Sequence, residues 1–311
     1  MHNSRLATHD SEQANHSKVS SVALAWGVTL LVSSLGDIVS FELTGVVPFW
    51  LFWAKTGLLG ALILMSWRWE PMKALRSFFV MLMAITLLMR ANTWLLGSSG
   101  WTMWQNQQSF SVVAITAQSV ETGVALLLIG MLFLLRKRRQ QFFLVRGDVN
   151  IKVKPVKWLG QKSSSPLWRF GLVFTLVVII AQFFMFILPL SPTSGTLHHL
   201  IPFIPTILLL AVANGFTEEI TFRAAPISTV YEVTGKSNAI WMAAILFGLS
   251  HYIGGIPSGI PGVLTTTLLG WFFGKCMMDT KGFFLPWLFH ALQDILPFTL
   301  MTLAAISRIS T

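Results

Sequence analysis

Long apolar runs separated by short polar stretches make up most of this chain. Runs long enough to cross a bilayer as α-helices occur at 21–41, 46–66, 77–98, 110–135, 168–190, 200–231, 237–253, 259–279 and 283–305. The pattern predicts an all-α fold, a polytopic transmembrane helical bundle with about nine spanning helices. The 200–231 run is interrupted by Pro226, and the 237–253 run is close to the lower length limit for a span.

The polar stretches divide the chain into four predicted parts. These are a polar tail at 1–20, a four-helix membrane region at 21–135, a basic loop at 136–167 and a C-terminal membrane region at 168–305. The first apolar run follows the tail without a small-residue cleavage pattern. We therefore interpret this run as a retained helix and not as a removed signal peptide.

Composition agrees with a membrane protein. Hydrophobic residues account for 54% of the 311 positions, and charged residues for only 11%. Soluble domains carry about 25% charged residues, so a water-soluble fold is excluded. The single cysteine, Cys276, also excludes an internal disulfide.

The basic residues are concentrated next to one loop. Segment 136–169 contains ten Lys or Arg residues and one acid, Asp148. The positive-inside rule predicts that this loop and the N-terminus are cytoplasmic, and we expect the membrane to be a bacterial inner membrane. Because the net charge of +10 is concentrated here, it indicates orientation and not nucleic-acid binding. The 136–167 loop is also a candidate site for anionic lipid head groups.

The N-terminal spans contain two pairs of charges that we expect to form structural ion pairs. Consecutive spans are antiparallel, so residues equidistant from the connecting turn lie at equal depth. Arg90 and Glu121 are equidistant from one outer loop, and Asp37 and Lys55 are equidistant from another. A charge in the bilayer core is costly, which makes pairing of neighbours the simplest explanation.

The C-terminal spans carry a denser set of ionisable residues. These are Glu218, Glu219, Arg223, His251, His290 and Asp294. Glu219 and Arg223 are spaced i,i+4, so they are predicted to pair along one helix face. Glu218 is then left without a partner on its own helix.

The other ionisable side chains are predicted to lie at similar depths in the membrane. Glu218 and His251 are equidistant from the polar turn at 233–236, so they are predicted to face each other across a helical hairpin. His290 and Asp294 share one face of the last helix at a similar depth. The four groups are therefore expected to converge, either as a reactive site or as a buried polar network that fixes helix packing.

Three motifs carry these residues. Residues 218–223 read E-E-x-x-x-R, the F-x-x-x-H motif begins at Phe247, and residues 290–294 read H-x-x-x-D. In this order, on apolar helices, they resemble the CPBP group of intramembrane proteases, which includes CAAX proteases and bacteriocin-processing proteases. The resemblance covers about residues 200–300, and the first four spans lie outside it.

The resemblance implies an intramembrane endopeptidase that hydrolyses a peptide bond of a membrane-associated protein or peptide. It implies that Glu218 is the general base and that His251 is its partner. His290 and Asp294 would polarise the scissile carbonyl group and stabilise the oxyanion. An ionised Asp294 cannot donate a hydrogen bond, so it must be protonated or must orient His290 instead. Structural support would come from Glu219, Arg223 and Phe247.

The resemblance leaves two possibilities for a metal. The family was long described as metalloproteases, and Glu218, His251 and His290 could bind zinc. The chain lacks the H-E-x-x-H arrangement, which places two histidines one helical turn apart. We therefore expect Glu218 to activate water directly, with no cofactor.

Hydrolysis in the bilayer requires a cavity that admits water. The Gly- and Pro-rich stretch 254–262 follows His251 and is a candidate border of such a cavity. We expect access from the cytoplasmic side. Two other functions fit the same residues, a proton- or ion-coupled transporter and a non-catalytic membrane regulator.

Overall fold

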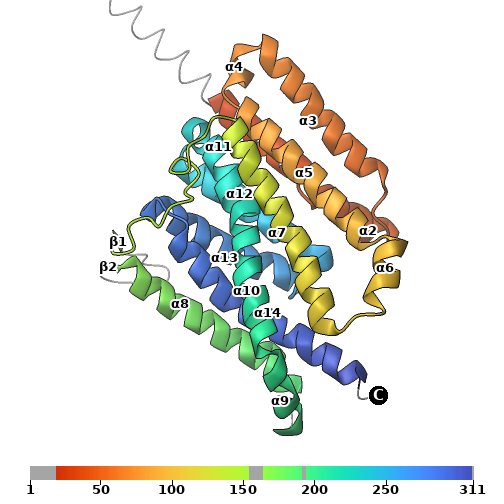
Figure 1. Ribbon diagram of the computed structural model, residues 1–311. Helices are drawn as coiled ribbons and strands as arrows, with labels where there is room; N and C mark the ends of the chain where they lie inside the picture. Colours follow the sequence, from red (N-terminus) through yellow and green to blue (C-terminus); the bar gives the residue numbers. More distant parts are fainter. Residues whose placement is uncertain (1–18, 154–163, 191–193, 310–311) are drawn as a thin grey trace, which may run out of the picture.

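The computed structural model describes residues 19–153, 164–190 and 194–309. They form a bundle of long helices (Figure 1), which confirms the predicted all-α polytopic fold. The only strands in this part of the chain are β1 (Lys152–Val153) and β2 (Ser165–Pro166), two residues each, which pair antiparallel.

The N-terminal region contains four long helical segments and two short helices. The first segment, Val19–Thr44, includes α2 (Leu35–Thr44). It is followed by α3 (Trp50–Arg68), α4 (Glu70–Lys73), α5 (Arg76–Leu96), α6 (Ser99–Gln105) and α7 (Phe110–Leu134).

The C-terminal region begins with α8 (Leu167–Gln182), which continues through a π-helical turn, η2 (Phe183–Ile187), and a 3₁₀ turn, η3 (Leu188–Leu190). The chain then forms α9 (Ser194–Leu200), η4 (Ile201–Phe203), α10 (Ile204–Glu219), the π-helical turn η5 (Ile220–Ala224) and α11 (Ala225–Thr234). The last helices are α12 (Lys236–Gly254), α13 (Gly259–Thr280) and α14 (Phe284–Ile309).

Seven helical segments among the described residues are long and apolar enough to cross a membrane. Helices also form at the other two predicted spans, as α12 with 19 residues and α13 with 22 residues. These two contain more polar side chains and are not among the seven. They pack against each other so closely that a Cβ on Gly270 would lie 3.1 Å from the Cα of Ala244.

Pro226 does not end the helix in which it lies. It stands in the first turn of α11, directly after η5, where a missing N–H group costs little. The helical path therefore runs from Ile204 to Thr234. It ends at Gly235, whose φ of 81° is a conformation that favours glycine. The predicted hairpin with α12 follows directly.

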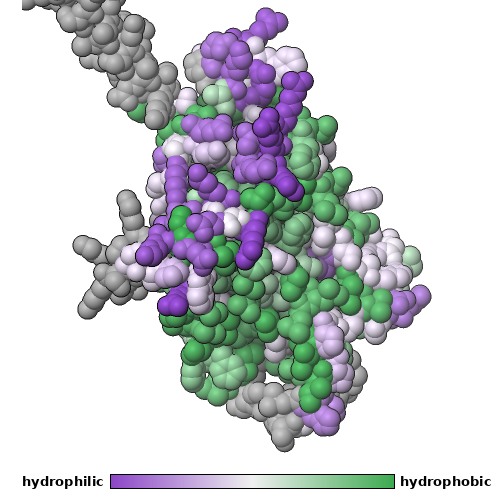
Figure 2. All heavy atoms as spheres, turned by 60° about the vertical axis from the view of Figure 1, so that its left-hand side comes forward, coloured by the Kyte–Doolittle hydropathy of each residue, from purple (hydrophilic) through white to green (hydrophobic). Residues whose placement is uncertain are grey.

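One end of the bundle, here named the basic end, gathers the three stretches 136–153, 233–236 and 280–283. The Phe283 N–H donates to the Val145 carbonyl at 2.8 Å, and Lys137 Nζ lies 3.7 Å from a Glu232 carboxylate oxygen. Figure 2 shows hydrophilic side chains gathered over the upper part of one face, with hydrophobic side chains below. The stretches predicted to lie on one side of the membrane therefore lie together. Part of the basic loop, residues 154–163, lies outside the described residues.

The orientation of the basic end can be tested with single cysteines. Gln140 is exposed at the basic end, and Gln107 is exposed between α6 and α7 at the opposite end. In intact cells, we expect an impermeant thiol reagent to label Gln107→Cys and not Gln140→Cys, because the basic end should be cytoplasmic. Cys276 is buried, so the parent protein is the control. The reverse labelling pattern would invert the topology.

One of the two predicted N-terminal ion pairs forms. Lys55 Nζ lies 2.6 Å from Asp37 Oδ2, which confirms the first pair. The predicted pair of Arg90 and Glu121 is wrong. Arg90 lies over aromatic rings, whereas Glu121 interacts with Asn92, two residues further along α5. Two residues turn a helix by about 200°, so equal depth was not sufficient to bring Arg90 to Glu121.

Candidate active site

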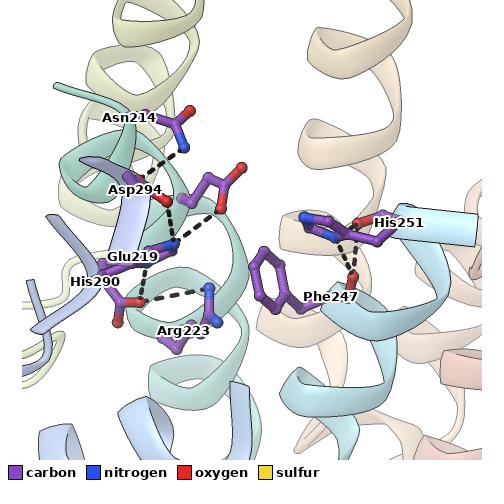
Figure 3. Close-up of polar contacts among 9 residues, drawn as sticks. Asn214, Glu219, Arg223, Phe247, His251, His290 and Asp294 are labelled. Atoms are coloured by element: carbon purple, nitrogen blue, oxygen red, sulfur yellow. Dashed lines mark hydrogen bonds and ion pairs between the residues drawn. The ribbon is translucent and has the colours of Figure 1, made fainter. Parts of the chain in front are cut away.

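The ionisable residues of the C-terminal region come from three packed helices (Figure 3). α10 and α14 approach closely at Gly215. A Cβ added to this glycine would lie only 3.0 Å from the Ala291 nitrogen. The α10–η5 segment carries Glu218, Glu219 and Arg223, α12 carries Phe247 and His251, and α14 carries His290 and Asp294.

His290 is at the centre of the cluster. Its Nδ1 lies 2.8 Å from Glu219 Oε1, and its Nε2 lies 3.2 Å from Glu218 Oε2 and 3.6 Å from Asp294 Oδ1. The Phe273 ring stacks on the imidazole with 4.9 Å between ring centroids. The predicted convergence of Glu218, His290 and Asp294 is therefore present in the structure.

Glu219 and Arg223 form the predicted pair along the helix. Arg223 NH1 lies 3.4 Å from Glu219 Oε1, and both side chains are fully buried. The Arg223 guanidinium also lies over the Phe247 ring, 3.8 Å from its centroid. Because Glu219 also contacts His290, it belongs to the polar cluster. The sequence had suggested only a supporting role for Glu219.

His251 does not pair with Glu218 as predicted. Its Nδ1 lies 3.0 Å from the Phe247 carbonyl oxygen and 3.4 Å from Ser250 Oγ. The Phe247 ring lies between the His251 ring and the His290 cluster (Figure 3). Phe247 precedes His251 by one turn on the same face. Glu218 and His251 line the same cavity but form no ion pair. Among the described residues, both hydrogen-bond contacts of the His251 ring are at Nδ1 and none is at Nε2.

Asn214 is a member of the cluster that the sequence analysis missed. Its Nδ2 donates a hydrogen bond to Asp294 Oδ2 at 3.0 Å. The signal was its spacing, since Asn214 stands four residues before Glu218 on the same apolar helix. With its second oxygen held in this way, Asp294 presents the other oxygen to His290.

A cavity of about 200 Å³ adjoins the cluster and is lined by Glu218, His251, His290 and Asp294. Because one water needs only about 10–15 Å³ of such volume, there is room for water beside the carboxylates. The 254–257 stretch also lines it, as predicted, together with Pro297 and Met301 of α14 and Gln182 of α8. The cavity therefore extends away from the basic end. If the basic end is cytoplasmic, as the charge pattern predicts, this position favours access from the opposite side over the expected cytoplasmic side.

Exposure distinguishes the two adjacent glutamates. The Glu218 side chain is 22% exposed, whereas the Glu219 side chain is fully buried. Glu218 is thus the carboxylate that reaches the cavity, and Glu219 holds the far nitrogen of His290. A carboxylate next to an oriented imidazole can accept a proton from water and pass it on.

Comparison with known families gives one match. Residues 200–296 match the model of the Rce1-like family, described as type II CAAX prenyl endopeptidase Rce1-like. This confirms the resemblance to CAAX-type intramembrane proteases over the segment that contains every residue of the cluster. No curated protein and no solved structure shows significant similarity to the chain.

Proposed function

We propose that this integral membrane protein is an intramembrane endopeptidase in which Glu218 activates water, since residues 200–296 match the model of the Rce1-like family of CAAX-type endopeptidases. The observation that carries the proposal is the contrast in exposure. Glu218 is the one acid of the adjacent pair that reaches the cavity, and it contacts an imidazole whose other nitrogen is held by a buried carboxylate.

The proposed reaction uses Glu218 and His290 as one unit. Glu218 accepts a proton from water as the water oxygen attacks the scissile carbonyl carbon. The His290 imidazole, held by Glu219, stabilises the developing oxyanion when its Nε2 carries a proton, because Glu218 no longer attracts that N–H group once it has taken the proton from water. The proton on Glu218 then passes to the leaving amine nitrogen as the C–N bond breaks, and the carboxylate is regenerated.

Asp294 and His251 take supporting positions in this proposal. Asp294 accepts a hydrogen bond from Asn214 and faces His290, which favours an orienting role over direct donation to the oxyanion. His251 Nδ1 is 3.0 Å from a carbonyl oxygen of its own helix. With Nδ1 donating to this oxygen, Nε2 of the neutral imidazole can accept a hydrogen bond from a substrate N–H group. In this proposal His251 contacts the substrate and is not the direct partner of Glu218.

The positions of the possible zinc ligands support a reaction that does not use a metal. Both nitrogens of His290 lie within 3.2 Å of a glutamate oxygen, where they are already partnered. Zinc requires its ligands about 2.0–2.2 Å away around one point. No three His, Cys, Asp or Glu side chains in the described part of the chain are grouped in that way. Glu218, His251 and His290 would have to rearrange to bind zinc.

The shape of the cavity bears on the substrate. It extends toward the 254–257 stretch and the second half of α14, so the substrate segment would enter from the side opposite the basic end. With the basic end cytoplasmic, the substrate would be a membrane-associated protein or peptide cleaved in the outer half of the bilayer. Anionic lipids remain proposed partners of the 136–167 loop.

A comparison of membrane and secreted proteins from cells carrying the wild type or Glu218→Ala tests this proposal. We expect specific peptides to be lost in the variant and the uncleaved precursors to accumulate. With a substrate identified in this way, purified wild-type protein should keep full activity in a strong chelator. Loss of activity that zinc restores would disprove the metal-free reaction. Identical peptide profiles would argue against the protease.

A further inference from the structure

A second cavity, of about 380 Å³, lies between the N-terminal helices and the helices of the active site. Its walls come from the first helical segment, α3, α5, η5 and α12, and from the 47–49 stretch. Thr221, Phe222 and Ser250 border it, but Glu218 and His290 do not. The proposed peptide hydrolysis makes no use of this cavity.

The charges that line this second cavity do not balance. Asp37 and Lys55 neutralise each other at 2.6 Å. Arg90 also lines the cavity, and no carboxylate among the described residues lies within ion-pair distance of it. Its guanidinium carbon is 4.8 Å from the Phe49 ring centroid and 5.7 Å from that of Phe52. The cavity therefore has one cation without a protein counter-charge.

The rest of the wall is apolar with a few hydroxyl groups. Val32, Leu82, Ile85 and Met89 supply much of the apolar surface, and Ser34, Thr86 and Thr93 supply hydroxyls. Arg90 stands six residues before the end of α5, which places its Cα about 9 Å from the end of that helix. One cation without a counter-charge beside an apolar wall matches an amphiphile with one negative charge.

We propose that this cavity binds an anionic amphiphile of the bilayer, in which Arg90 binds the acid group and the apolar wall holds an alkyl chain. A guanidinium binds carboxylate or phosphate through two parallel hydrogen bonds, so a free fatty acid and an anionic phospholipid share the required chemistry. Ser250 lines this cavity and has its Oγ 3.4 Å from His251 Nδ1. The ligand would thus lie against the residue that precedes His251.

Thermal unfolding of delipidated protein in an uncharged detergent tests the proposal without any assay of hydrolysis. We expect a saturable rise in Tm with oleate or with phosphatidylglycerol, and none with oleyl alcohol, which has the same chain without the charge. A response to only one of the two acids would support the site and identify the source of its ligand. An equal response to oleyl alcohol, or none to either acid, would overturn the proposal.

Arg90→Gln should weaken the apparent affinity at least about tenfold, because the charge-assisted contacts are lost. Arg68→Gln is the matched control, since Arg68 is exposed at the end of α3 and does not line the cavity. Unchanged affinity in Arg90→Gln would overturn the proposal.

A second pair of variants keeps the test decisive if Arg90→Gln does not fold. Thr86→Phe fills the cavity while Arg90 is retained, and it should abolish the saturable response. Thr116→Phe is its control, because both threonines hydrogen-bond to the carbonyl four residues earlier but Thr116 lies outside the cavity. Saturable binding that persists in Thr86→Phe would overturn the proposal.

Discussion

Glu218→Gln is expected to lower the rate of peptide hydrolysis at least about 100-fold while leaving the protein folded. Glutamine keeps the size of the side chain and can still hydrogen-bond to His290, which lies 3.2 Å from Glu218. It cannot accept a proton from water, so only the chemical step should be lost. The measurement is the cleavage rate of purified protein on a substrate identified by proteomics, with thermal unfolding recorded on the same sample.

Two further variants determine whether the effect belongs to the active site. Glu232→Gln is the control, because Glu232 is an exposed acid that lies against Lys137 at the basic end; its activity should be unchanged. Glu218→Gln combined with His290→Ala should be little worse than either change alone, since groups that act as one unit give non-additive losses. Full activity in Glu218→Gln would disprove the proposed mechanism.

The helices could be predicted closely because the bilayer fixes their length. The apolar run 110–135 became Phe110–Leu134, and 237–253 became Lys236–Gly254. The short helices Ser99–Gln105 and Ser194–Leu200 were not predicted, because they are too short and too polar to leave a spanning signal. Pro226 suggested an interruption, but a π-helical turn before it keeps the helical path continuous.

Contacts within one helix were predicted reliably, because a separation of four residues fixes both height and direction. Glu219 with Arg223 and His290 with Asp294 are examples. His290 and Asp294 were also predicted to lie at a similar depth to Glu218, and the three side chains are close together in the structure.

Contacts between helices were predicted less well, because equal distance from a turn fixes only height. The pair Asp37 and Lys55 formed, whereas Arg90 lies over the Phe49 ring and Glu121 interacts with Asn92. His251 lines the same cavity as Glu218, but it forms no ion pair with Glu218, and the Phe247 ring lies between its imidazole and that of His290. The rotation of each helix about its axis depends on the packing of many side chains, which one sequence does not reveal.

Arg223→Ala is expected to destabilise the protein by about 3–5 kcal/mol, the usual cost of removing one partner of a buried ion pair. Arg223 and Glu219 are both fully buried, and Arg223 also covers the Phe247 ring. The change would leave the Glu219 carboxylate with the His290 imidazole as its remaining side-chain partner and would open a void against the ring. The fall in Tm of the purified protein measures the effect.

The matched control for Arg223→Ala is Lys275→Ala. Lys275 and Asp279 are also spaced i,i+4 with 2.5 Å between charged atoms, but the lysine side chain is 25% exposed. Partly solvated pairs contribute about 0–1 kcal/mol, so this change should have a small effect. Equal stability losses in the two variants would contradict the importance of burial.

A double variant separates the structural role of the Arg223–Glu219 pair from its role in the site. Replacing both charges, as in Glu219→Gln with Arg223→Met, removes the uncompensated charge and keeps most of the volume. Much of the stability lost in Arg223→Ala should return, because a buried pair can be replaced by apolar groups at little cost. Hydrolysis should stay low, because His290 Nδ1 has then lost the carboxylate that lies 2.8 Å away. Recovery of stability together with full activity would show that Glu219 serves packing alone.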